Sequence, residues 1–169
     1  MKERGGPPDG ASCFEGMGNS KPLLTVTGLK TYFYTSGAVF RALEGVDFSI
    51  DQGETLGLVG ETGCGKSVTA LSIMRLISFP PGKIVGGSVY FEGRDLLRLS
   101  EKEIRGEIRG KKISMIFQEP RTSMNPTFRI GQQMTEVIML HQKLSGKGAE
   151  RKAVEMLEKV QIPEALRVF

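Results

Sequence analysis

Three stretches in the first half of the chain alternate apolar and polar residues, as half-buried strands do. They are residues 24–27, residues 46–51 and residues 85–91, and the turn Glu92-Gly93 follows the last of them. Because the side chains of a strand point alternately to its two faces, each stretch would place its apolar residues on one face of a sheet. The pattern therefore predicts a strand at each of these positions.

Two other apolar runs are continuous, which is typical of strands buried on both faces. They span residues 55–59 and residues 113–117, and Pro120 would stop the second strand because proline cannot donate to a sheet. After Ser67, the apolar residues Val68, Leu71 and Met74 recur at helical spacing. The first run therefore predicts a strand that leads through a short loop into a helix.

Helical periodicity dominates the second half of the chain. Ser100 and Glu103 match a capping box, which predicts a short helix with Ile104 and Ile108 on one face. Past residue 127, two further sets of apolar residues each fit one helix face. The first set is Ile130, Met134, Val137, Ile138 and Leu144, and the second is Val154, Leu157 and Val160. Strand-rich sequence followed by helical sequence predicts an α/β fold.

Composition divides the chain into three parts. Residues 1–21 are rich in Gly, Pro, Ser and charge and lack an apolar pattern, so we expect a disordered N-terminal extension, with Met17 as an alternative start. Residues 22–126 hold all the predicted strands. Residues 127–169 hold the later helices and are expected to form the beginning of a helical subdomain.

Bulk properties narrow the class of protein further. The chain has 169 residues, of which 39% are hydrophobic and 25% charged, as in an ordinary globular domain. A formal net charge of +4 with scattered lysines argues against a nucleic-acid partner. No apolar stretch reaches the ~20 residues that a bilayer requires, and the N-terminus lacks a secretory apolar segment. We therefore expect a cytoplasmic protein that reaches a membrane only through a partner.

One motif carries specific chemistry. It is Gly60-Glu61-Thr62-Gly63-Cys64-Gly65-Lys66-Ser67, a complete G-x-x-x-x-G-K-[ST] phosphate-binding loop, and Val68 follows it. Its glycines let successive backbone N–H groups point at an anion, while the Lys66 ammonium can reach the β- and γ-phosphates and the Ser67 hydroxyl can bind Mg²⁺. The predicted strand before it and the helix after it are the context that this motif requires. Alkylation of the Cys64 thiol, inside the loop, is expected to obstruct nucleotide binding.

A second polar residue stands at the end of a predicted strand. Gln118 directly follows the run 113–117, and the carboxyl ends of strands in such sheets surround the nucleotide. The amide oxygen of Gln118 could bind Mg²⁺ or hold the attacking water. Taken alone, a glutamine at this position is more often a polar residue with ordinary partners, so its combination with the phosphate loop matters.

In that combination the chain resembles the ATP-binding subunits of ABC transporters, in particular the branch that imports dipeptides and oligopeptides, with its nickel-importing relatives. The resemblance rests on the phosphate loop 60–67, on Gln118 as the Q-loop glutamine, and on the stretch 117–126, Phe-Gln-Glu-Pro-Arg-Thr-Ser-Met-Asn-Pro. Residues 29–33 and 113–117 match the same branch. The resemblance covers residues 22–169 and implies an ABC-type P-loop ATPase core with an antiparallel β subdomain.

The resemblance also implies roles for single residues. ATP and Mg²⁺ would be the ligands, with Lys66 and Gln118 as catalytic residues and Ser67 and Gln118 at the metal. The loop 60–67 with Val68 would hold the phosphates. An aromatic side chain would stack on adenine, and spacing favours Phe33, with Tyr32 as the second choice.

The resemblance implies protein partners as well. Transmembrane permease subunits would bind the residues after Gln118, and a second ATP-binding subunit, identical or paralogous, would close head to tail on the first. A solute-binding protein would act indirectly. The whole assembly would lie on the inner face of the cell membrane, with this chain as a peripheral subunit.

Three family features are missing from the 169 residues: the Leu-Ser-Gly-Gly-Gln signature, an apolar strand that ends in Asp followed by the catalytic Glu, and a switch histidine. Residues 144–147, Leu-Ser-Gly-Lys, come too early for the signature and are predicted to be a loop. The chain is therefore expected to be an N-terminal fragment, truncated before the signature, that binds ATP weakly without hydrolysing it.

Other functions remain as alternatives. A soluble ABC ATPase without a transport role is one, although Ser123-Met124-Asn125-Pro126 argues against it, and a non-catalytic nucleotide-binding module is another. A P-loop GTPase would require Asp-x-x-Gly and Asn-Lys-x-Asp motifs, and neither occurs in the sequence.

Overall fold

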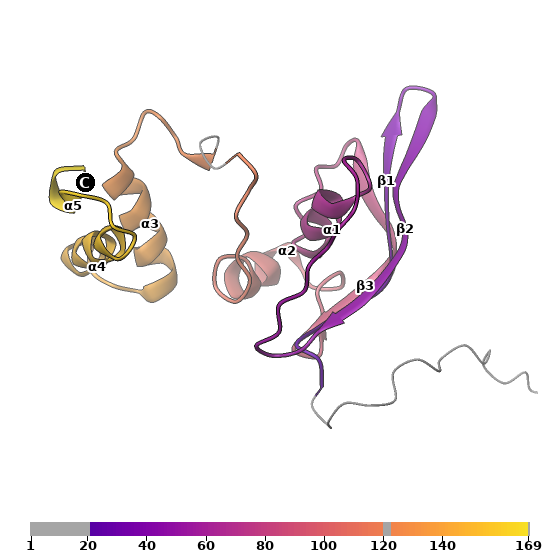
Figure 1. Cartoon of the computed structure of the whole chain (residues 1–169), viewed down its shortest axis with the longest axis horizontal. Coiled ribbons are helices and arrows are strands. Elements are labelled where there is room, and N and C mark those ends of the chain that lie inside the picture. Colours follow the sequence, from indigo (N-terminus) through magenta and orange to yellow (C-terminus); the bar gives the residue numbers. More distant parts are fainter. Residues whose placement is uncertain (1–20, 120–122, 169) are drawn as a thin grey trace, which may run out of the picture. The chain divides into compact units, whose positions relative to one another are not determined.

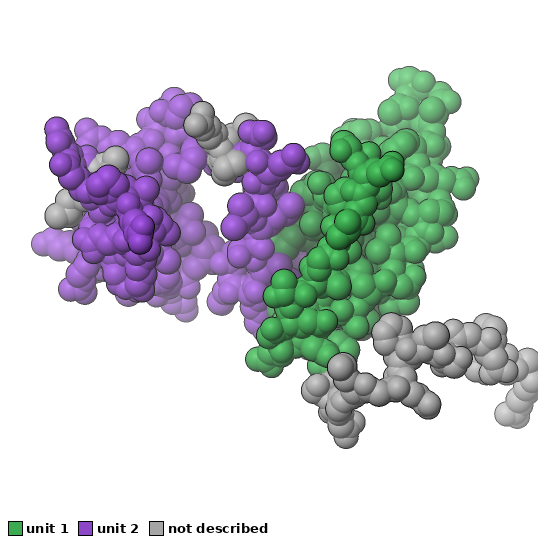
Figure 2. Space-filling view, viewed as in Figure 1, with its two compact units in different colours: residues 1–98 green, residues 99–169 purple. Residues whose placement is uncertain are grey.

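The computed structural model describes residues 21–119 and 123–168, and the chain forms two compact units (Figure 2). Unit 1 comprises residues 1–98 and unit 2 comprises residues 99–169. All of the predicted N-terminal extension except Lys21 lies outside the described residues, as does Pro120.

Unit 1 is built on one antiparallel sheet. Its strands are β1 (Leu24–Thr35), β2 (Ala38–Ile50), β3 (Gly82–Phe91) and the short β4 (Arg94–Asp95), in the spatial order β2-β1-β3-β4 (Figure 1). The three alternating stretches of the sequence lie in β1, β2 and β3, so these predictions are confirmed. The real strands are longer than the alternation suggested, because glycines and irregular register interrupt the pattern within them.

The interruption is visible where the register of β1 shifts against both of its neighbours, between Val26 and Lys30. Gly28 takes a left-handed conformation there, with φ +56°, and its N–H donates to Asp47 Oδ1 at 2.7 Å. Gly87 on β3 approaches so closely that an added Cβ would lie 2.5 Å from the Gly28 oxygen. This irregularity therefore requires glycine at position 87 for lack of space.

The first helix, α1 (Lys66–Ile73), begins at Lys66, inside the phosphate-binding motif, and includes most of the helix predicted after the loop. Its buried residues are Thr69, Ser72 and Ile73, whereas Val68 is only half-buried. The apolar spacing therefore predicted the helix correctly but gave only part of its buried face. The cause is that the polar side chains of Thr69 and Ser72 have hydrogen-bond partners and can be buried.

Two predicted strands are wrong. Residues 55–59 and 113–117 carry no strand, and Val59 and Ile116 are 97% and 93% exposed. A strand requires a neighbouring backbone for its N–H and C=O groups. Among the described residues, neither run pairs with another strand; the second has only an isolated bridge between Ile113 and Arg109.

Unit 2 begins with the predicted capping box. Glu103 N donates to Ser100 Oγ at 3.3 Å, and Ser100 N donates to Glu103 Oε2 at 2.8 Å. The helix that it starts, α2 (Glu101–Glu103), continues as the π-helix η1 (Ile104–Ile108), in which Ile104 and Ile108 are buried as predicted. The remaining helices are α3 (Ile130–Gln142), α4 (Gly146–Lys159) and α5 (Ala165–Val168).

The core between α3 and α4 consists of Ile138, Ala149 and Ala153, with Met134 packed against it. Ile138 and Met134 were on the predicted face, but Val137 and Val160 are 56% and 68% exposed, so that part of the prediction is wrong. The small alanines of α4 let the helices approach closely, so the buried face follows Ala149 and Ala153 instead of the larger apolar residues.

The loop predicted at residues 144–147 is shorter than expected. Leu144 and Ser145 lie in the connection, but α4 already begins at Gly146. Ser145 is the N-cap residue, and its carbonyl accepts the first helical hydrogen bond from Ala149 N at 2.8 Å. Serine is a favoured N-cap, but the Ser145 side chain makes no capping hydrogen bond, so only its backbone carbonyl takes part in starting the helix.

Candidate phosphate-binding site

Glycine conformation and strand packing shape the loop at residues 60–67. Gly63 and Gly65 have φ of +90° and +98°, a region that other residues rarely adopt. A Cβ at Gly65 would lie 2.8 Å from Leu43 Cδ2 and 2.9 Å from the Ala42 oxygen. The loop therefore packs against β2 at Gly65, and there is no room for a side chain at that position. Sequence inspection had not singled out these two β2 residues.

The N-terminus of α1 completes the loop. Gly65 is the N-cap, and its carbonyl accepts hydrogen bonds from Thr69 N at 2.8 Å and from Thr69 Oγ1 at 3.0 Å. The first N–H groups of a helix have no intrahelical acceptor, and the helix dipole makes this end positive. Ser67 is exposed in the first turn. This end of α1 therefore presents backbone donors and a hydroxyl to an anion.

The charge of the loop comes from Lys66. Its Nζ donates to the carbonyl oxygens of Gly60 and Glu61 at 2.7 and 2.8 Å and lies 3.5 Å from Cys64 Sγ. The Lys66 side chain is thus folded back so that its ammonium group binds the backbone of its own loop. Carbonyl oxygens are weaker partners for an ammonium than phosphate oxygens, because a phosphate carries a full negative charge and a carbonyl only a partial one. The arrangement can therefore exchange these contacts for a phosphate.

The two aromatic candidates lie on different faces of β1. Thr31, next to them, reaches α1 through a hydrogen bond between its Oγ1 and Ser72 Oγ at 2.8 Å. Strand alternation puts Phe33 on that same face, where its ring lies against Gly82, whose added Cβ would be 2.8 Å from Phe33 Cε1. The α1 face is also the one that leads to the phosphate loop. The adenine role of Phe33 stays a prediction.

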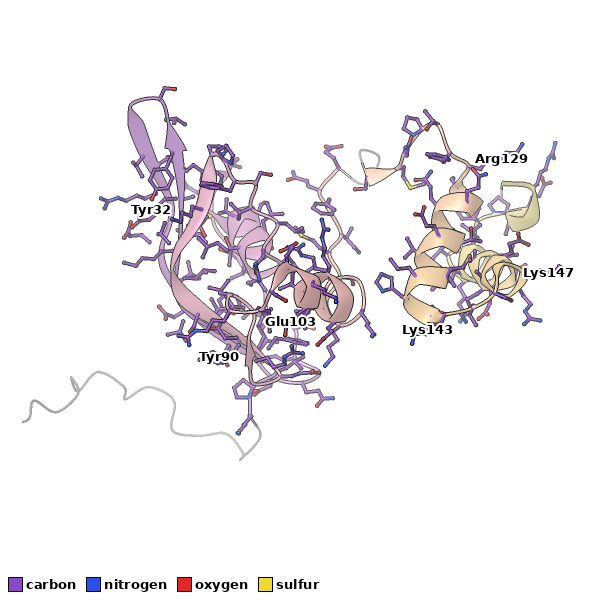
Figure 3. All side chains as sticks on the ribbon, turned by 180° about the vertical axis from the view of Figure 1, so that it is seen from behind. Tyr32, Tyr90, Glu103, Arg129, Lys143 and Lys147 are labelled. Carbon is purple, nitrogen blue, oxygen red and sulfur yellow. The ribbon has the colours of Figure 1, made fainter. Side chains whose placement is uncertain are left out.

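Tyr32 projects from the other face of the sheet (Figure 3). Its hydroxyl donates to Glu44 Oε1 at 2.9 Å, and the Arg41 guanidinium lies 5.7 Å from the ring centroid. The hydrogen bond raises the pKa of Tyr32 above its ordinary value and lowers that of Glu44. Tyr32 is thus engaged in a surface network with Glu44 and Arg41, on the face that α1 does not cover.

Gln118 lies in unit 2, exposed, in the bend that follows the run 113–117. The phosphate loop lies in unit 1. The expected sharing of a metal between Ser67 and Gln118 stays a prediction. Across the parts of the chain that the structure describes, no group of three or more His, Cys, Asp or Glu side chains could hold a metal ion by itself.

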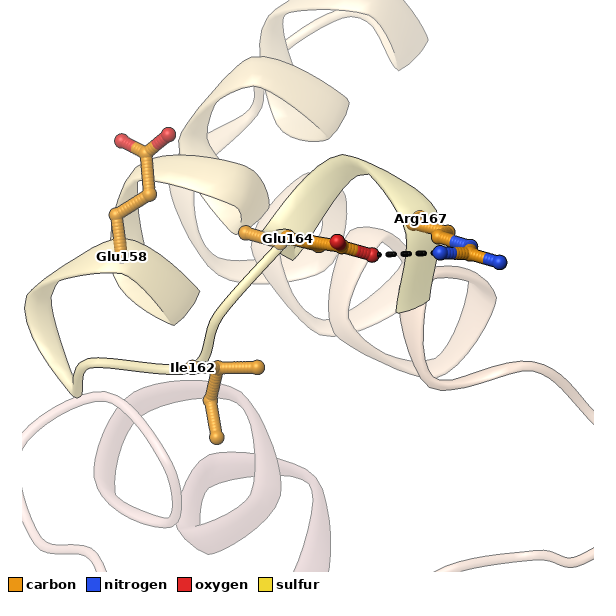
Figure 4. Close-up of a pocket in the computed structure, with 5 residues that line it drawn as sticks. Glu158, Ile162, Glu164 and Arg167 are labelled. Carbon is orange, nitrogen blue, oxygen red and sulfur yellow. Dashed lines mark hydrogen bonds and ion pairs between the residues drawn. The ribbon is translucent and has the colours of Figure 1, made fainter.

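A depression of about 510 Å³ lies between the end of α4 and α5 (Figure 4). It is lined by Glu158, Ile162, Glu164, Ala165 and Arg167, and Arg167 Nη1 already donates to Glu164 Oε2 at 2.9 Å. None of these residues belongs to the predicted site.

No helix of residues 21–119 and 123–168 combines the length and the apolar composition of a membrane span.

Comparison with known proteins agrees with this geometry. The family profile described as ABC transporter matches residues 43–168. The oligopeptide transport ATP-binding protein OppD of Bacillus subtilis is 52% identical over 141 residues, which cover 83% of this chain and 39% of the relative. The dipeptide transport ATP-binding protein DppD of the same organism is 46% identical, over 84% of this chain and 42% of the relative.

A third relative and a solved structure extend the comparison. The peptidoglycan transport ATP-binding protein YejF of Agrobacterium fabrum is 43% identical, over 86% of this chain and 27% of the relative. The dimeric ATP-binding cassette MJ0796, in a post-hydrolysis state bound to ADP and Pi, has the same fold, with a TM-score of 0.72 at 22% identity. That match covers 83% of this chain and 58% of the other. The chain therefore spans about two fifths of the length of OppD and DppD.

Proposed function

Because the chain belongs to the ABC transporter family, we propose that it forms part of the ATP-binding subunit of an importer for peptides or similar small solutes. The single observation that carries the proposal is the phosphate loop, with left-handed Gly63 and Gly65 packed on β2 and the Lys66 ammonium over its centre. The names of the relatives OppD and DppD, ATP-binding proteins of oligopeptide and dipeptide transport, support the role in peptide transport.

In this role different residues would bind different parts of MgATP. The backbone N–H groups of the loop and of the first turn of α1 would bind the phosphate oxygens, and Lys66 would neutralise charge on the β- and γ-phosphates. Ser67 and Gln118 would hold Mg²⁺, which offsets further charge on the phosphates when bound. Phe33 would stack on the adenine ring.

The proposed partners follow from the same role. Two transmembrane permease subunits would bind the segment after Gln118, and a second ATP-binding subunit would face the first across the nucleotides. A solute-binding protein would deliver cargo to the permease. The subunit would therefore work on the cytoplasmic face of the membrane. Copurification with permease subunits distinguishes this proposal from a soluble ABC ATPase that has no transport role.

The proposed nucleotide site is tested by Lys66→Ala. The substitution removes the cation of the loop, and charge-assisted hydrogen bonds contribute ~1.5–3 kcal/mol each, so we expect nucleotide affinity to fall by at least roughly tenfold. Binding of a fluorescent ATP analogue gives the dissociation constant. Lys83→Ala is the matched control, since it removes the same charge from an exposed position on β3. Equal affinities of the Lys66→Ala protein and the wild type would refute the site.

A further inference from the structure

The strongest unexplained feature of unit 2 is a side-chain amide that makes three hydrogen bonds to the backbone of one loop. Gln133 lies in the first turns of α3, and its Oε1 accepts a hydrogen bond from Asn125 N at 2.9 Å. Its Nε2 donates to the carbonyl oxygens of Asn125 and Phe128, each at 2.9 Å. With Asn125 the amide forms a reciprocal pair, as a backbone peptide does in a sheet, and the additional bond to Phe128 closes the loop between them.

A second amide holds the same loop from within. Asn125 Oδ1 accepts hydrogen bonds from Thr127 N at 3.0 Å and from Thr127 Oγ1 at 2.7 Å. Pro126, between these two residues, has its φ fixed by the pyrrolidine ring. Residues 125–128 are therefore fixed by one proline and two side-chain amides. Such a density of restraints on an exposed loop is unusual, because exposed loops are normally the mobile parts of a protein.

Exposed apolar side chains lie at both ends of the fixed loop. Met124, directly before it, is 42% exposed, and Phe128, at its end, is 57% exposed. Methionine and phenylalanine are enriched in the centres of protein interfaces, and a loop held rigid in advance loses less conformational entropy on binding. The loop lies within the segment after Gln118 that the proposed function assigns to the permease contact.

We propose that Gln133 is a positioning residue for that contact: it fixes the loop 125–128 in the conformation that docks onto a cytoplasmic loop of the permease. This inference rests on the proposed function. In this role Gln133 needs no contact of its own with nucleotide or permease. It acts through the backbone of Asn125 and Phe128, which sets where the Met124 and Phe128 side chains are presented.

The neighbouring residue provides a closely matched control. Gln132 precedes Gln133 in the first turn of α3, and its Oε1 accepts a hydrogen bond from Arg129 N at 3.2 Å. Among the described contacts this is the only hydrogen bond of the Gln132 side chain. Gln132→Glu keeps an acceptor there, whereas Gln133→Glu keeps one acceptor but removes both donors and faces a carboxylate toward two carbonyls. Both substitutions add the same charge near the same helix end, so effects of the helix dipole cancel.

The first measurement is amide hydrogen exchange of residues 123–129. We expect Gln133→Glu to speed exchange at the Asn125 N–H by between roughly two- and tenfold, because an acceptor for this N–H remains but both donor bonds are lost and the carboxylate repels the two carbonyls, which releases the loop. Gln132→Glu should leave the exchange unchanged. Gln133→Met, which is apolar and of similar length, should act like Gln133→Glu. Unchanged exchange in both Gln133 variants would overturn the proposal.

The second measurement uses the complete gene product and the permease subunits in nanodiscs. We expect Gln133→Glu to weaken permease binding at least fivefold while the affinity for MgATP stays within twofold of wild type, and Gln132→Glu to change neither. If wild type binds the permease and Gln133→Glu binds equally well, or if both glutamate variants weaken binding alike, the positioning role is wrong. If wild type itself does not bind, the proposed function fails, and this inference fails with it.

Discussion

Cys64 places a reactive side chain inside the phosphate loop. It is exposed, and its Sγ lies 3.5 Å from Lys66 Nζ. The sulfur is also close to the start of the loop, since a Cβ added at Gly60 would lie 2.6 Å from it. A group attached to this sulfur therefore has to displace Lys66 or enter the space that the phosphates would occupy.

We accordingly predict that N-ethylmaleimide weakens nucleotide binding by at least roughly tenfold, since it displaces a charge-assisted contact. A fluorescent ATP analogue reports the affinity before and after treatment. Cys64→Ser is the control, because it keeps a small side chain in the loop and leaves Cys13 as the remaining thiol. Loss of binding in the treated Cys64→Ser protein would mean that Cys13, not Cys64, is responsible.

A second residue-scale effect concerns pH. Lys159 Nζ and Lys152 Nζ donate to the Glu155 carboxylate at 2.9 and 3.0 Å, and these bonds hold the pKa of Glu155 below its ordinary value of 4.5. A group whose pKa is lowered by folding stabilises the fold above its unfolded pKa. That stabilisation is lost as the pH falls through the lower, folded value.

Glu155→Gln should therefore lower the melting temperature of α4 slightly at pH 7, and the difference from wild type should shrink as the pH falls below 4.5. Circular dichroism at 222 nm follows the melting. Glu158→Gln, on the same helix, makes the same change of charge without an ion pair among the described contacts and is the control for the effect of charge alone. A difference that grows toward acid pH would contradict the assignment.

At the scale of elements, a buried polar pair joins β1 to α1. Thr31 and Ser72 are both fully buried, and Ser72 Oγ also donates to Val68 O at 2.7 Å, so Thr31 donates in the bond between the two hydroxyls. A helix that carries the phosphate loop is thereby fixed to the sheet by a directional bond instead of apolar contact alone. The bond sets how α1 is rotated about its axis.

We predict that Thr31→Val lowers the free energy of unfolding by about 1 kcal/mol, the typical net value of a hydrogen bond, because valine preserves the shape of threonine. Urea unfolding measures this change. Thr27→Val, at an exposed position of the same strand, is the control. In a double-mutant cycle with Ser72→Ala, a coupling energy near zero would show that the two hydroxyls do not interact.

Elements that depend on local patterns could be predicted, and those that depend on distant partners could not. The alternation in β1, the glycine loop before α1 and the Ser100–Glu103 capping box each involve neighbouring residues, and all three are present. Residues 55–59 have the composition of a buried strand, but a strand also requires a paired backbone, which no local pattern reports. The candidate site divides in the same way: the motif predicts a phosphate-binding role for Lys66, whereas the packing of the β2 backbone against the loop could not be predicted from the motif.

The hydrogen bonds of Gln133 also could not be predicted from the local sequence. A polar residue on the exposed side of an amphipathic helix gives no signal, and its partners lie eight and five residues earlier in the chain. The buried hydroxyl of Thr31 is different, because it lies on the same face of β1 as other core positions. A threonine there suggests a polar partner across the core, so that signal was available in the sequence.

On the scale of the whole molecule, the proposed function requires more groups for hydrolysis than for nucleotide binding. The phosphate loop would supply contacts to phosphates that are present before the reaction. Hydrolysis further requires a group that orients water and charge that stabilises the transferring phosphoryl group. The 169 residues contain no apolar strand ending in Asp-Glu and no Leu-Ser-Gly-Gly-Gln motif that could serve a facing subunit.

We therefore predict that the purified 169-residue chain binds ATP but releases phosphate no faster than background. Phosphate release with excess MgATP measures this, and Lys66→Ala is the reference, since any release that survives it does not come from the loop. A turnover of about 1 per second, at the low end of ordinary enzymes, that disappears in Lys66→Ala would show that the residues present suffice for catalysis. Binding without turnover would instead locate the missing catalytic groups outside these residues, as the proposed head-to-tail pairing of subunits requires.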